Sequence, residues 1–343
     1  MVERGVIGVD LGGTKLLAGA VDPDLAVHHR TNRPVLGLDQ DGLVQMVADA
    51  VEEVWTAVGG EIEAVGFGIP CTFDVRTGIA IQAVNLPLRD IAFGELMAAR
   101  LGLPVVVDND ANAAALCEAR ARPGCTELVM LTLGTGIGGG LVLGGEVYRG
   151  WLGGGAELGH MVVEMDGPRC QGSCPNRGCL EAVASGTALV REASLAVARR
   201  RDTALGRAVE AGRELTGPLI TELARAGDPV ARDAIDLIGR RLGVGISSLV
   251  NIFNPQVMVV GGGVSAAGDL LLDPAREVMR ARALAPGRDV VRVEAAIHGA
   301  EAGLIGAAIM AREYTGAVRA GLRSPAGSAP SSPGSSSPPE LAI

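Results

Sequence analysis

Two strand-like runs in this sequence each end in a glycine-rich turn, and this repeat constrains the fold more than any other feature. The run at 5–10 leads into Asp-Leu-Gly-Gly-Thr (10–14), and the run at 127–133 leads into Thr-Leu-Gly-Thr-Gly (132–136). Backbone N–H groups in such turns form a concave site for anions, and glycine permits close approach. We therefore predict two related α/β domains, each presenting a glycine turn to a cleft between them.

The first domain is predicted to span residues 1–118. Apolar runs at 5–10 and 15–21 predict strands, and 25–31 is a candidate for a third. Residues 41–58 carry apolar side chains at helical spacing. The elements predicted after it are buried strands at 62–69 and 104–108 and a helix at 111–121. This order, strands followed by alternating helices and strands, is typical of α/β layers.

The second domain is predicted to span residues 119–314. After the strand at 127–133, a hairpin is expected at 140–148 with its turn at Gly144-Gly145. Helices are expected within 186–253, and the last of them ends near Asn254-Pro255. A strand at 257–260 then leads into Gly261-Gly262-Gly263 and a further helix. A closing helix at 300–313 is expected to pack back on the first domain. Residues 315–343 are predicted to form a tail, whose Ser, Pro and Gly composition from about residue 321 is typical of disorder.

The glycine turns favour phosphate binding over two other motifs. Gly134–Gly140 superficially matches a dinucleotide fingerprint, but it leads into a strand where that motif needs a helix. The Walker pattern is missing, and a single such turn would equally fit an ordinary hairpin. Two turns together with Gly261–Gly263 favour a nucleotide, and Asp10 is placed to hold Mg²⁺ through water. The predicted nucleotide-binding residues are Asp10, Gly12, Gly13, Thr14, Lys15, Thr135, Gly136, Gly262 and Gly263.

A second candidate site follows the predicted strand at 104–107, where Asp108-Asn109-Asp110 precedes a helix. Acidic residues at a helix start are often caps, and that reading fits one of the two aspartates. Phosphoryl transfer needs a carboxylate that orients the acceptor hydroxyl and takes its proton. We predict Asp110 as this base, with Asn109 beside it to hydrogen-bond a sugar hydroxyl.

A cysteine–histidine cluster is predicted to bind zinc. His160, Cys170, Cys174 and Cys179 give the pattern H-x9-C-x3-C-x4-C, whose three thiolates and one imidazole match a closed structural zinc shell. The alternatives are core cysteines or a redox pair, but the intervening residues are polar or turn-forming. Such a metal would rigidify a loop and direct Glu157, the free nitrogen of His160 and Glu181 toward the cleft. The other cysteines, Cys71, Cys117 and Cys125, are expected in the core.

Composition excludes several other classes of protein. The net charge of -9 argues against a nucleic-acid partner, which needs clustered Lys and Arg. No stretch reaches the roughly 20 apolar residues of a membrane span, and no signal peptide is recognisable, so a cytoplasmic protein is expected. Aromatic residues make up only 2%, which disfavours a simple carbohydrate-binding module built on aromatic platforms.

The chain resembles the ROK family of repressors and sugar kinases, and within it the bacterial glucokinases. The matching stretches, in family order over about residues 5–312, are DLGGTK (10–15), GFGIP (66–70), NLP (85–87), DNDANAAALCE (108–118), LTLGTGIGGG (131–140), GAELGH (155–160), CPNRGCLEAVASG (174–186) and GGG (261–263). The resemblance implies a two-domain actin-like ATPase (ribonuclease H-like) fold with an interdomain cleft, ATP with Mg²⁺, and zinc on His160 and the three cysteines. It also implies Asp110 as catalytic base, sugar contacts from Asn85, Asn109, Asp110, Glu157, His160 and Glu181, and a homodimer or homotetramer.

One departure from the family pattern concerns the cysteine loop. The common form is C-x-C-G-x-x-G-C, whereas three residues separate Cys170 from Cys174 here, and Pro175 replaces the glycine. The ligand count survives. Family members that use polyphosphate generally lack this cluster, which favours ATP as donor. The family's repressors carry a DNA-binding segment ahead of the first strand, for which a strand beginning near residue 5 leaves no room.

The sequence predicts an ATP-dependent hexose kinase with glucose as the leading acceptor. N-acetylmannosamine, N-acetylglucosamine and mannose remain alternatives, because relatives with those substrates share the same signatures. The second hypothesis is a sugar-sensing regulator without catalysis. A basic DNA-binding segment, or the loss of the catalytic base, would distinguish such a regulator from a kinase.

Overall fold

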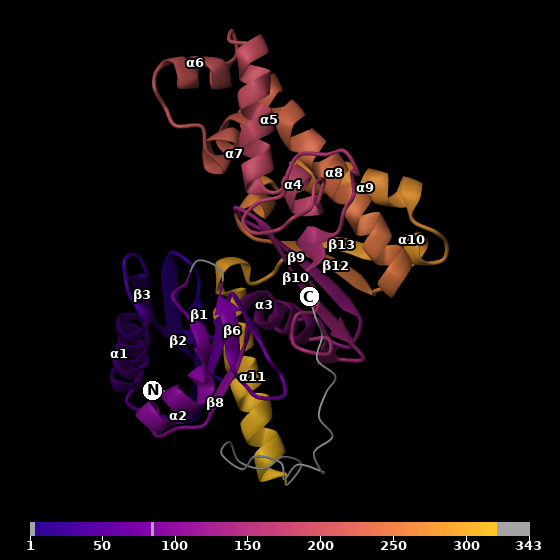
Figure 1. Cartoon of the computed structure of the whole chain (residues 1–343). Helices are drawn as coiled ribbons and strands as arrows, with labels where there is room; N and C mark the ends of the chain where they lie inside the picture. The colour runs from indigo at the N-terminus through magenta and orange to yellow at the C-terminus, as the bar shows by residue number, and fades with distance from the viewer. Residues whose placement is uncertain (1–3, 84–85, 321–343) are drawn as a thin grey trace, which may run out of the picture.

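The computed structural model describes residues 4–83 and 86–320, and it has two lobes with a long C-terminal helix that returns to the first lobe (Figure 1). Each lobe is built on one mixed sheet of five strands, as the repeated strand and turn predicts. Within these described ranges, no helix is both long enough and apolar enough to cross a membrane. The predicted sugar contact Asn85 lies outside the described residues.

The sheet of the first lobe has the strand order β3-β2-β1-β4-β8. β1 is antiparallel to β2 and parallel to β4, which in turn is parallel to β8. The third strand begins two residues later than the sequence indicates. The bounds of these strands are β1 Arg4–Leu11, β2 Lys15–Val21, β3 Val27–Pro34, β4 Glu61–Ile69 and β8 Val105–Asn109.

Helices α1 (Gln40–Val58), α2 (Phe93–Leu101) and α3 (Asp110–Arg120) belong to the same lobe. The apolar stripe that predicts α1 is buried, and the side chain of Asp39 caps its start by accepting from the amide of Gly42 at 2.8 Å. One part of this lobe has no counterpart in the predicted elements. It is a small antiparallel sheet of β5 (Cys71–Phe73), β6 (Ala80–Ala83) and β7 (Arg89–Ile91).

The sheet of the second lobe has the order β11-β10-β9-β12-β13. β9 (Leu128–Leu133) and β10 (Ile137–Leu143) form the hairpin around the second glycine turn, and β11 (Glu146–Val147) follows the predicted turn at Gly144-Gly145. β12 (Val257–Gly261) lies parallel to both β9 and β13 (Arg292–Ala295). The pairing of β12 with β9 places Gly261 opposite Thr132, so the second and third glycine segments share one edge of the sheet.

Helices stand above this sheet in the upper part of Figure 1. The longest, α8, ends at Phe253, and Asn254 caps it in the left-handed conformation before Pro255, as the sequence predicts. The helices of this lobe are α4 Leu180–Ala184, α5 Gly186–Arg199, α6 Ala204–Glu210, α7 Gly217–Arg225, α8 Pro229–Phe253, α9 Asp269–Arg282 and α10 Gly287–Val290, with short 3₁₀ turns η1 at Leu158–His160 and η2 at Gly263–Ala267.

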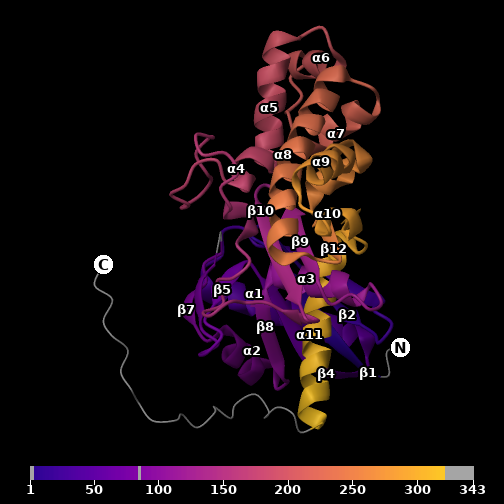
Figure 2. The same ribbon diagram turned by 90° about the vertical axis from the view of Figure 1, so that its right-hand side faces the viewer.

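The closing helix α11 (Ala302–Arg319) follows a 3₁₀ turn, η3 (Gly299–Glu301), and packs against the sheet of the first lobe (Figure 2). Contact is close because glycines stand at the crossings: a Cβ at Gly8 or Gly66 would overlap carbonyl oxygens of Leu304 or Ala307. The helix is longer than predicted. It runs to Arg319, since its apolar face continues to the buried Thr315, so residues 315–319 are helical and not part of the tail.

Candidate functional site

Asp108, Asn109 and Asp110 lie where strand β8 meets helix α3. The side chain of Asn109 caps α3, because its Oδ1 accepts from the amides of Ala111 (2.9 Å) and Asn112 (3.2 Å). The prediction that one of the two aspartates is the cap is therefore wrong: the residue between them takes that role. Asn109 still offers its Nδ2 to a ligand.

Asp110 is the predicted general base. It is the first residue of α3, and its Oδ1 accepts from the amide of Ala111 at 2.9 Å. Burial raises the pKa of this carboxyl, and the charge of Glu157 acts in the same direction. A raised pKa makes a carboxylate a better acceptor for the proton of a hydroxyl group.

Asp10 lies close to Asp110, at the end of β1. Burial raises the pKa of Asp10 to about 7, the Asp110 charge contributes to this, and Lys15 opposes it. The start of α11 closes the same space, since a Cβ at Gly303 would lie 2.7 Å from Cγ of Asp10. The Asp110 charge raises the proton affinity of the half-buried Asp10, and two neighbouring carboxylates suit a cation, so the donor chemistry here fits Mg²⁺.

The first glycine turn lies beside this acidic pair and closes the β1–β2 hairpin. The amide of Gly12 donates to the carbonyl of Lys15 at 2.9 Å, and the carbonyl of Thr14 accepts from the amide of Val35 at 3.0 Å. The side chain of Lys15, the single lysine of the sequence, is exposed. These contacts fix the turn that carries the predicted phosphate contacts.

The glycines of β10 have a second use that sequence reasoning missed. On one face of the strand, a Cβ at Gly140 would overlap the carbonyl oxygen of Ala111 in α3; on the other, a Cβ at Gly139 would press on Ala156 and Leu158. Both neighbours can therefore approach the strand closely. This double packing brings Asp110, from the first lobe, and Glu157, from the second, onto one small cavity.

This cavity has a volume of about 70 Å³. Asn109 and Asp110 line it from the first lobe, and Gly138, Gly139 and Glu157 line it from the second. Three of the predicted sugar contacts are thus brought together, each with a hydrogen-bonding side chain. A cavity between two lobes with a few convergent polar groups is typical of a ligand site.

The second glycine turn, Gly134–Gly136, connects the end of β9 to the start of β10 in the second lobe's sheet. Gly262 adopts a φ of +83°, and a Cβ there would overlap the backbone of Leu133, so the third glycine segment packs on the turn. A Cβ at Gly134 or Gly263 would meet no atom within 4 Å, so both backbones border open space. Such an open glycine backbone suits the close approach of phosphate groups.

Glu181, a predicted sugar contact, reaches this same turn. Its Oε2 accepts from the amide of Ile137 at 2.8 Å, and a Cβ at Gly136 would overlap the carboxylate. Its Oε1 lies 3.7 Å from Sγ of Cys170. Glu181 therefore lies between the cysteine loop and the glycine turn, and it is not among the residues that line the 70 Å³ cavity.

His160, Cys170, Cys174 and Cys179 come together as the sequence predicts. Their ligand atoms all lie within 4.8 Å of one another. The sulfurs of Cys174 and Cys179 are 3.9 Å apart, and Nδ1 of His160 is 3.5 Å from the sulfur of Cys170. In a tetrahedral zinc shell with Zn–S of about 2.3 Å, neighbouring sulfurs are separated by about 3.8 Å. The four residues thus fit zinc, and with Nδ1 on the metal side, His160 keeps Nε2 for other partners.

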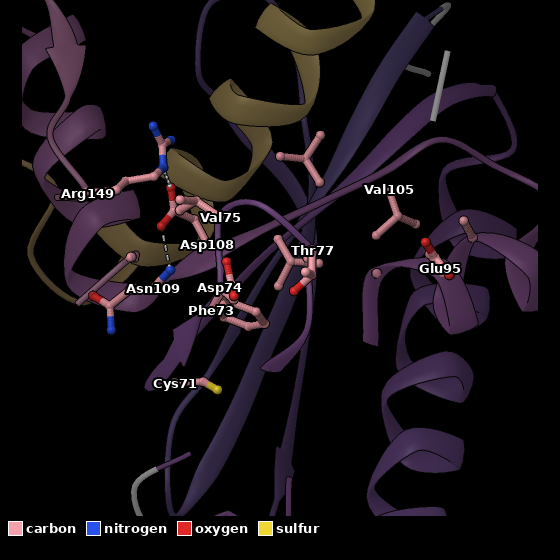
Figure 3. Close-up of a pocket in the computed structure, with 16 residues that line it drawn as sticks. Cys71, Phe73, Asp74, Val75, Thr77, Glu95, Val105, Asp108, Asn109 and Arg149 are labelled. Carbon is pink, nitrogen blue, oxygen red and sulfur yellow. Dashed lines mark hydrogen bonds and ion pairs between the residues drawn. The ribbon is translucent and has the colours of Figure 1, made fainter. Parts of the chain in front are cut away.

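A larger cavity of about 760 Å³ adjoins the first one, and Figure 3 shows its lining. The two cavities share Cys71, Asn109 and Gly153. On its wall, Nε of Arg149 lies 2.6 Å from Oδ2 of the buried Asp108 (Figure 3). Arg149 could not be predicted as a site residue, because one arginine after a hairpin carries no signal in a chain with so many arginines.

Comparison with known proteins gives one consistent result. The model of the ROK family matches residues 6–314. A glucokinase from Streptomyces coelicolor is 41% identical over 317 residues, which are 90% of this chain and 97% of that protein. A glucokinase from Thermotoga maritima is 35% identical over 320 residues, which are 92% of this chain and all of that protein.

Among solved structures, a ROK family glucokinase from Streptomyces griseus in complex with glucose and AMPPNP resembles this one with a TM-score of 0.79. The two are 38% identical, and the match covers 90% of this chain and 99% of that protein.

Proposed function

This chain belongs to the ROK family, and from that premise we propose that it transfers the terminal phosphate of ATP to glucose, giving glucose 6-phosphate and ADP. Its two lobes form the actin-like ATPase fold. The single observation that best supports the proposal is the half-buried Asp110, which lines a cavity together with Glu157 from the other lobe.

In the proposed mechanism, Asp110 orients the acceptor hydroxyl and takes its proton as the oxygen attacks the terminal phosphorus. The new bond forms between that oxygen and phosphorus, while the bond to the bridging oxygen of ATP breaks and ADP leaves. The raised pKa of Asp110 supports this role. Enclosure between the lobes excludes water, which would otherwise compete with the sugar as acceptor.

The nucleotide is proposed to lie along the three glycine segments. Its binding residues would be Gly12, Gly13, Thr14, Lys15, Thr135, Gly136, Gly262 and Gly263, with Asp10 holding Mg²⁺ through water. That cation supplies charge neutralisation at the phosphates when bound. Support comes from the open backbone at Gly134 and Gly263 and from the half-buried, electrostatically coupled acids Asp10 and Asp110.

The sugar is proposed to contact Asn109, Asp110 and Glu157, which line the cavity, and His160, which ends the 3₁₀ turn that follows Glu157. Glu181 joins them only if its carboxylate leaves the amide of Ile137 or shares it. Asn85 stays a prediction. The stereochemistry of the hexose depends on these contacts, so mannose and the N-acetylated hexosamines are the alternative substrates.

A zinc ion on His160, Cys170, Cys174 and Cys179 is proposed to be structural, because all four tetrahedral positions would be filled by protein. We place the reaction in the cytoplasm, where ATP is available and thiols stay reduced. The homodimer or homotetramer implied by the family stays a prediction.

The test is ADP release from ATP and Mg²⁺ with a panel of hexoses, comparing wild type, Asp110→Asn and the control Asp24→Asn. The control makes the same chemical change at an exposed turn residue. We expect turnover to be highest on glucose. The control should keep this activity, and Asp110→Asn should lose it. Highest turnover on another hexose would change the substrate and keep the mechanism. No turnover on any sugar from folded, zinc-containing protein would contradict the kinase and favour the regulator.

A further inference from the structure

The second glycine turn is held from one side by a single segment, residues 171–187. The amide of Gly186 donates to the carbonyl of Gly134 at 2.8 Å, and Oγ1 of Thr187 donates to the carbonyl of Thr135 at 2.8 Å. Together with the contact from Glu181 to the amide of Ile137, these bonds fix the orientation of successive peptide groups in the turn. Any contact that orients residues 171–187 therefore also orients the glycine turn.

Gln171 makes a further contact from inside the cysteine loop. Its Nε2 lies 3.3 Å from the carbonyl oxygen of Thr135 and 3.2 Å from Oγ of Ser185, so one amide group bridges the two. Ser185 is fully buried and caps helix α5. Gln171 directly follows Cys170, in the segment where this chain has three residues between cysteines and the common family form has one.

We propose that Gln171 is a positioning residue that couples the zinc loop to the nucleotide turn. The proposal rests on the proposed function, since it takes Thr135 and Gly136 as nucleotide contacts. Its geometry is direct: Cys170 holds the start of the loop in the ligand cluster, and the next side chain holds the carbonyl of Thr135.

Gln171 can be separated experimentally from the other links. Glu181 also joins the loop to the turn, but it is a predicted sugar contact, so its loss would change two binding events at once. Gln171 does not line the 70 Å³ cavity in the structure. Its replacement is therefore expected to weaken nucleotide binding and to leave the KM for glucose near that of wild type.

The experiment compares wild type, Gln171→Ala, Gln171→Glu and the control Ser173→Ala. Ser173 lies in the same loop and is exposed. Binding of AMPPNP with Mg²⁺ is measured by calorimetry, zinc content is measured on the same samples, and KM and kcat follow with glucose and ATP. We expect Gln171→Ala to bind AMPPNP about three- to tenfold more weakly, the range of one neutral hydrogen bond. Gln171→Glu should be no better, since it has no N–H to donate, and Ser173→Ala should match wild type.

A second arm tests the coupling itself. Removal of zinc with a chelator should weaken AMPPNP binding in wild type and weaken it less in Gln171→Ala, because the link is already broken. Three results would overturn the proposal: unchanged AMPPNP affinity in Gln171→Ala with full zinc content, loss of zinc from that variant, or equal effects of the chelator on both proteins. Wild type that binds AMPPNP but phosphorylates no sugar would contradict the proposed function alone. Wild type that binds no AMPPNP would overturn both.

Discussion

Arg149 and Asp108 form an ion pair across the two lobes, with Nε of the arginine 2.6 Å from Oδ2 of the carboxylate. Asp108 is the penultimate residue of strand β8, two positions before the proposed base Asp110, and Arg149 begins the loop that leads to Glu157. The backbone of Arg149 also accepts from the amide of Gly155 at 2.9 Å, which shapes this loop. The pair therefore fixes the distance between the two acids of the proposed site.

Replacement of Arg149 by alanine is expected to lower both stability and sugar affinity. It leaves the buried Asp108 without its charged partner, which costs about 2 kcal/mol of unfolding free energy. The loop with Glu157 is then less well held, so the KM for glucose should rise more than kcat falls. Urea denaturation and steady-state kinetics measure the two effects.

The control is Arg76→Ala, which breaks a comparable arginine–aspartate pair with Asp74 whose arginine side chain is more than half exposed. A pair at the surface contributes about 0–1 kcal/mol, so this variant should remain close to wild type. Equal effects of the two substitutions would show that Arg149 has no special role.

Asp10 should make the stability of the protein pH-dependent. Its pKa is raised from 3.8 to about 7 in the folded state, so folding favours the protonated form. This contribution to stability is complete below about pH 4 and is lost as the pH rises through 7. At about 1.4 kcal/mol per pKa unit, its upper bound is about 4 kcal/mol.

The variant Asp10→Asn lacks this titration. In magnesium-free urea denaturation, the free energy of unfolding of the variant relative to wild type should therefore increase between pH 5 and pH 8. A difference that stays constant across this range would mean that Asp10 titrates near its ordinary pKa.

Features set by neighbouring residues in the chain could be predicted from the sequence. Asp110 follows a strand and opens a helix, so its place at the lobe boundary follows from local pattern alone. The same is true of the hairpin turn at Gly144-Gly145 and of the end of α8 at Asn254. The spacing of Cys170, Cys174 and Cys179 likewise predicts the cluster, because short loops keep ligands near one another.

Features set by contacts between distant segments could not be predicted. Asp108 pairs with Arg149 across 41 positions, and neither residue has a neighbour that signals the other. The glycines of β10 resemble a phosphate turn throughout, but only the structure separates the turn from the part that packs on Ala111 and Leu158. The orientation of Glu181 depends on the fold of the cysteine loop, which the motif alone does not specify.

Zinc removal should unfold the cysteine loop locally. Residues 171–177 are mostly exposed, so little burial holds the loop without the metal, and Arg169 before it and Arg177 within it are exposed as well. We expect one zinc per chain, a lower melting temperature after chelation, and faster tryptic cleavage at these arginines. Cys179→Ser should behave like the chelated protein.

The matched control is Cys125→Ser, which removes a buried cysteine outside the cluster and should keep one zinc per chain. Zinc content by mass spectrometry separates the two variants. Zinc that remains at full occupancy in Cys179→Ser would contradict the proposed ligand set.

Glu118 is expected to be essential for the connection between the lobes. Its fully buried carboxylate accepts from the amides of Ile297 and His298 at 3.0 Å each, and Arg122 donates to it at 2.6 Å. Ile297 and His298 directly precede η3 and α11, where the chain returns from the second lobe to the first. One side chain at the end of α3 thus holds the link that the closing helix needs.

The variant Glu118→Gln keeps an oxygen for the two amides but removes the charge opposite Arg122. Breaking a buried ion pair in this way costs about 3 kcal/mol or more, and it should increase hydrogen exchange at 297–301 before other regions. The double variant Glu118→Gln/Arg122→Met should be less destabilised than Glu118→Gln alone, since it removes the buried Arg122 charge, which the single variant leaves with only the partly exposed Glu294 as a charged partner. Urea denaturation of the three proteins with exchange measured by mass spectrometry tests this. A cost below about 0.5 kcal/mol for Glu118→Gln, the usual range of surface substitutions, would show that the amide contacts alone hold the link and that the ion pair with Arg122 is dispensable.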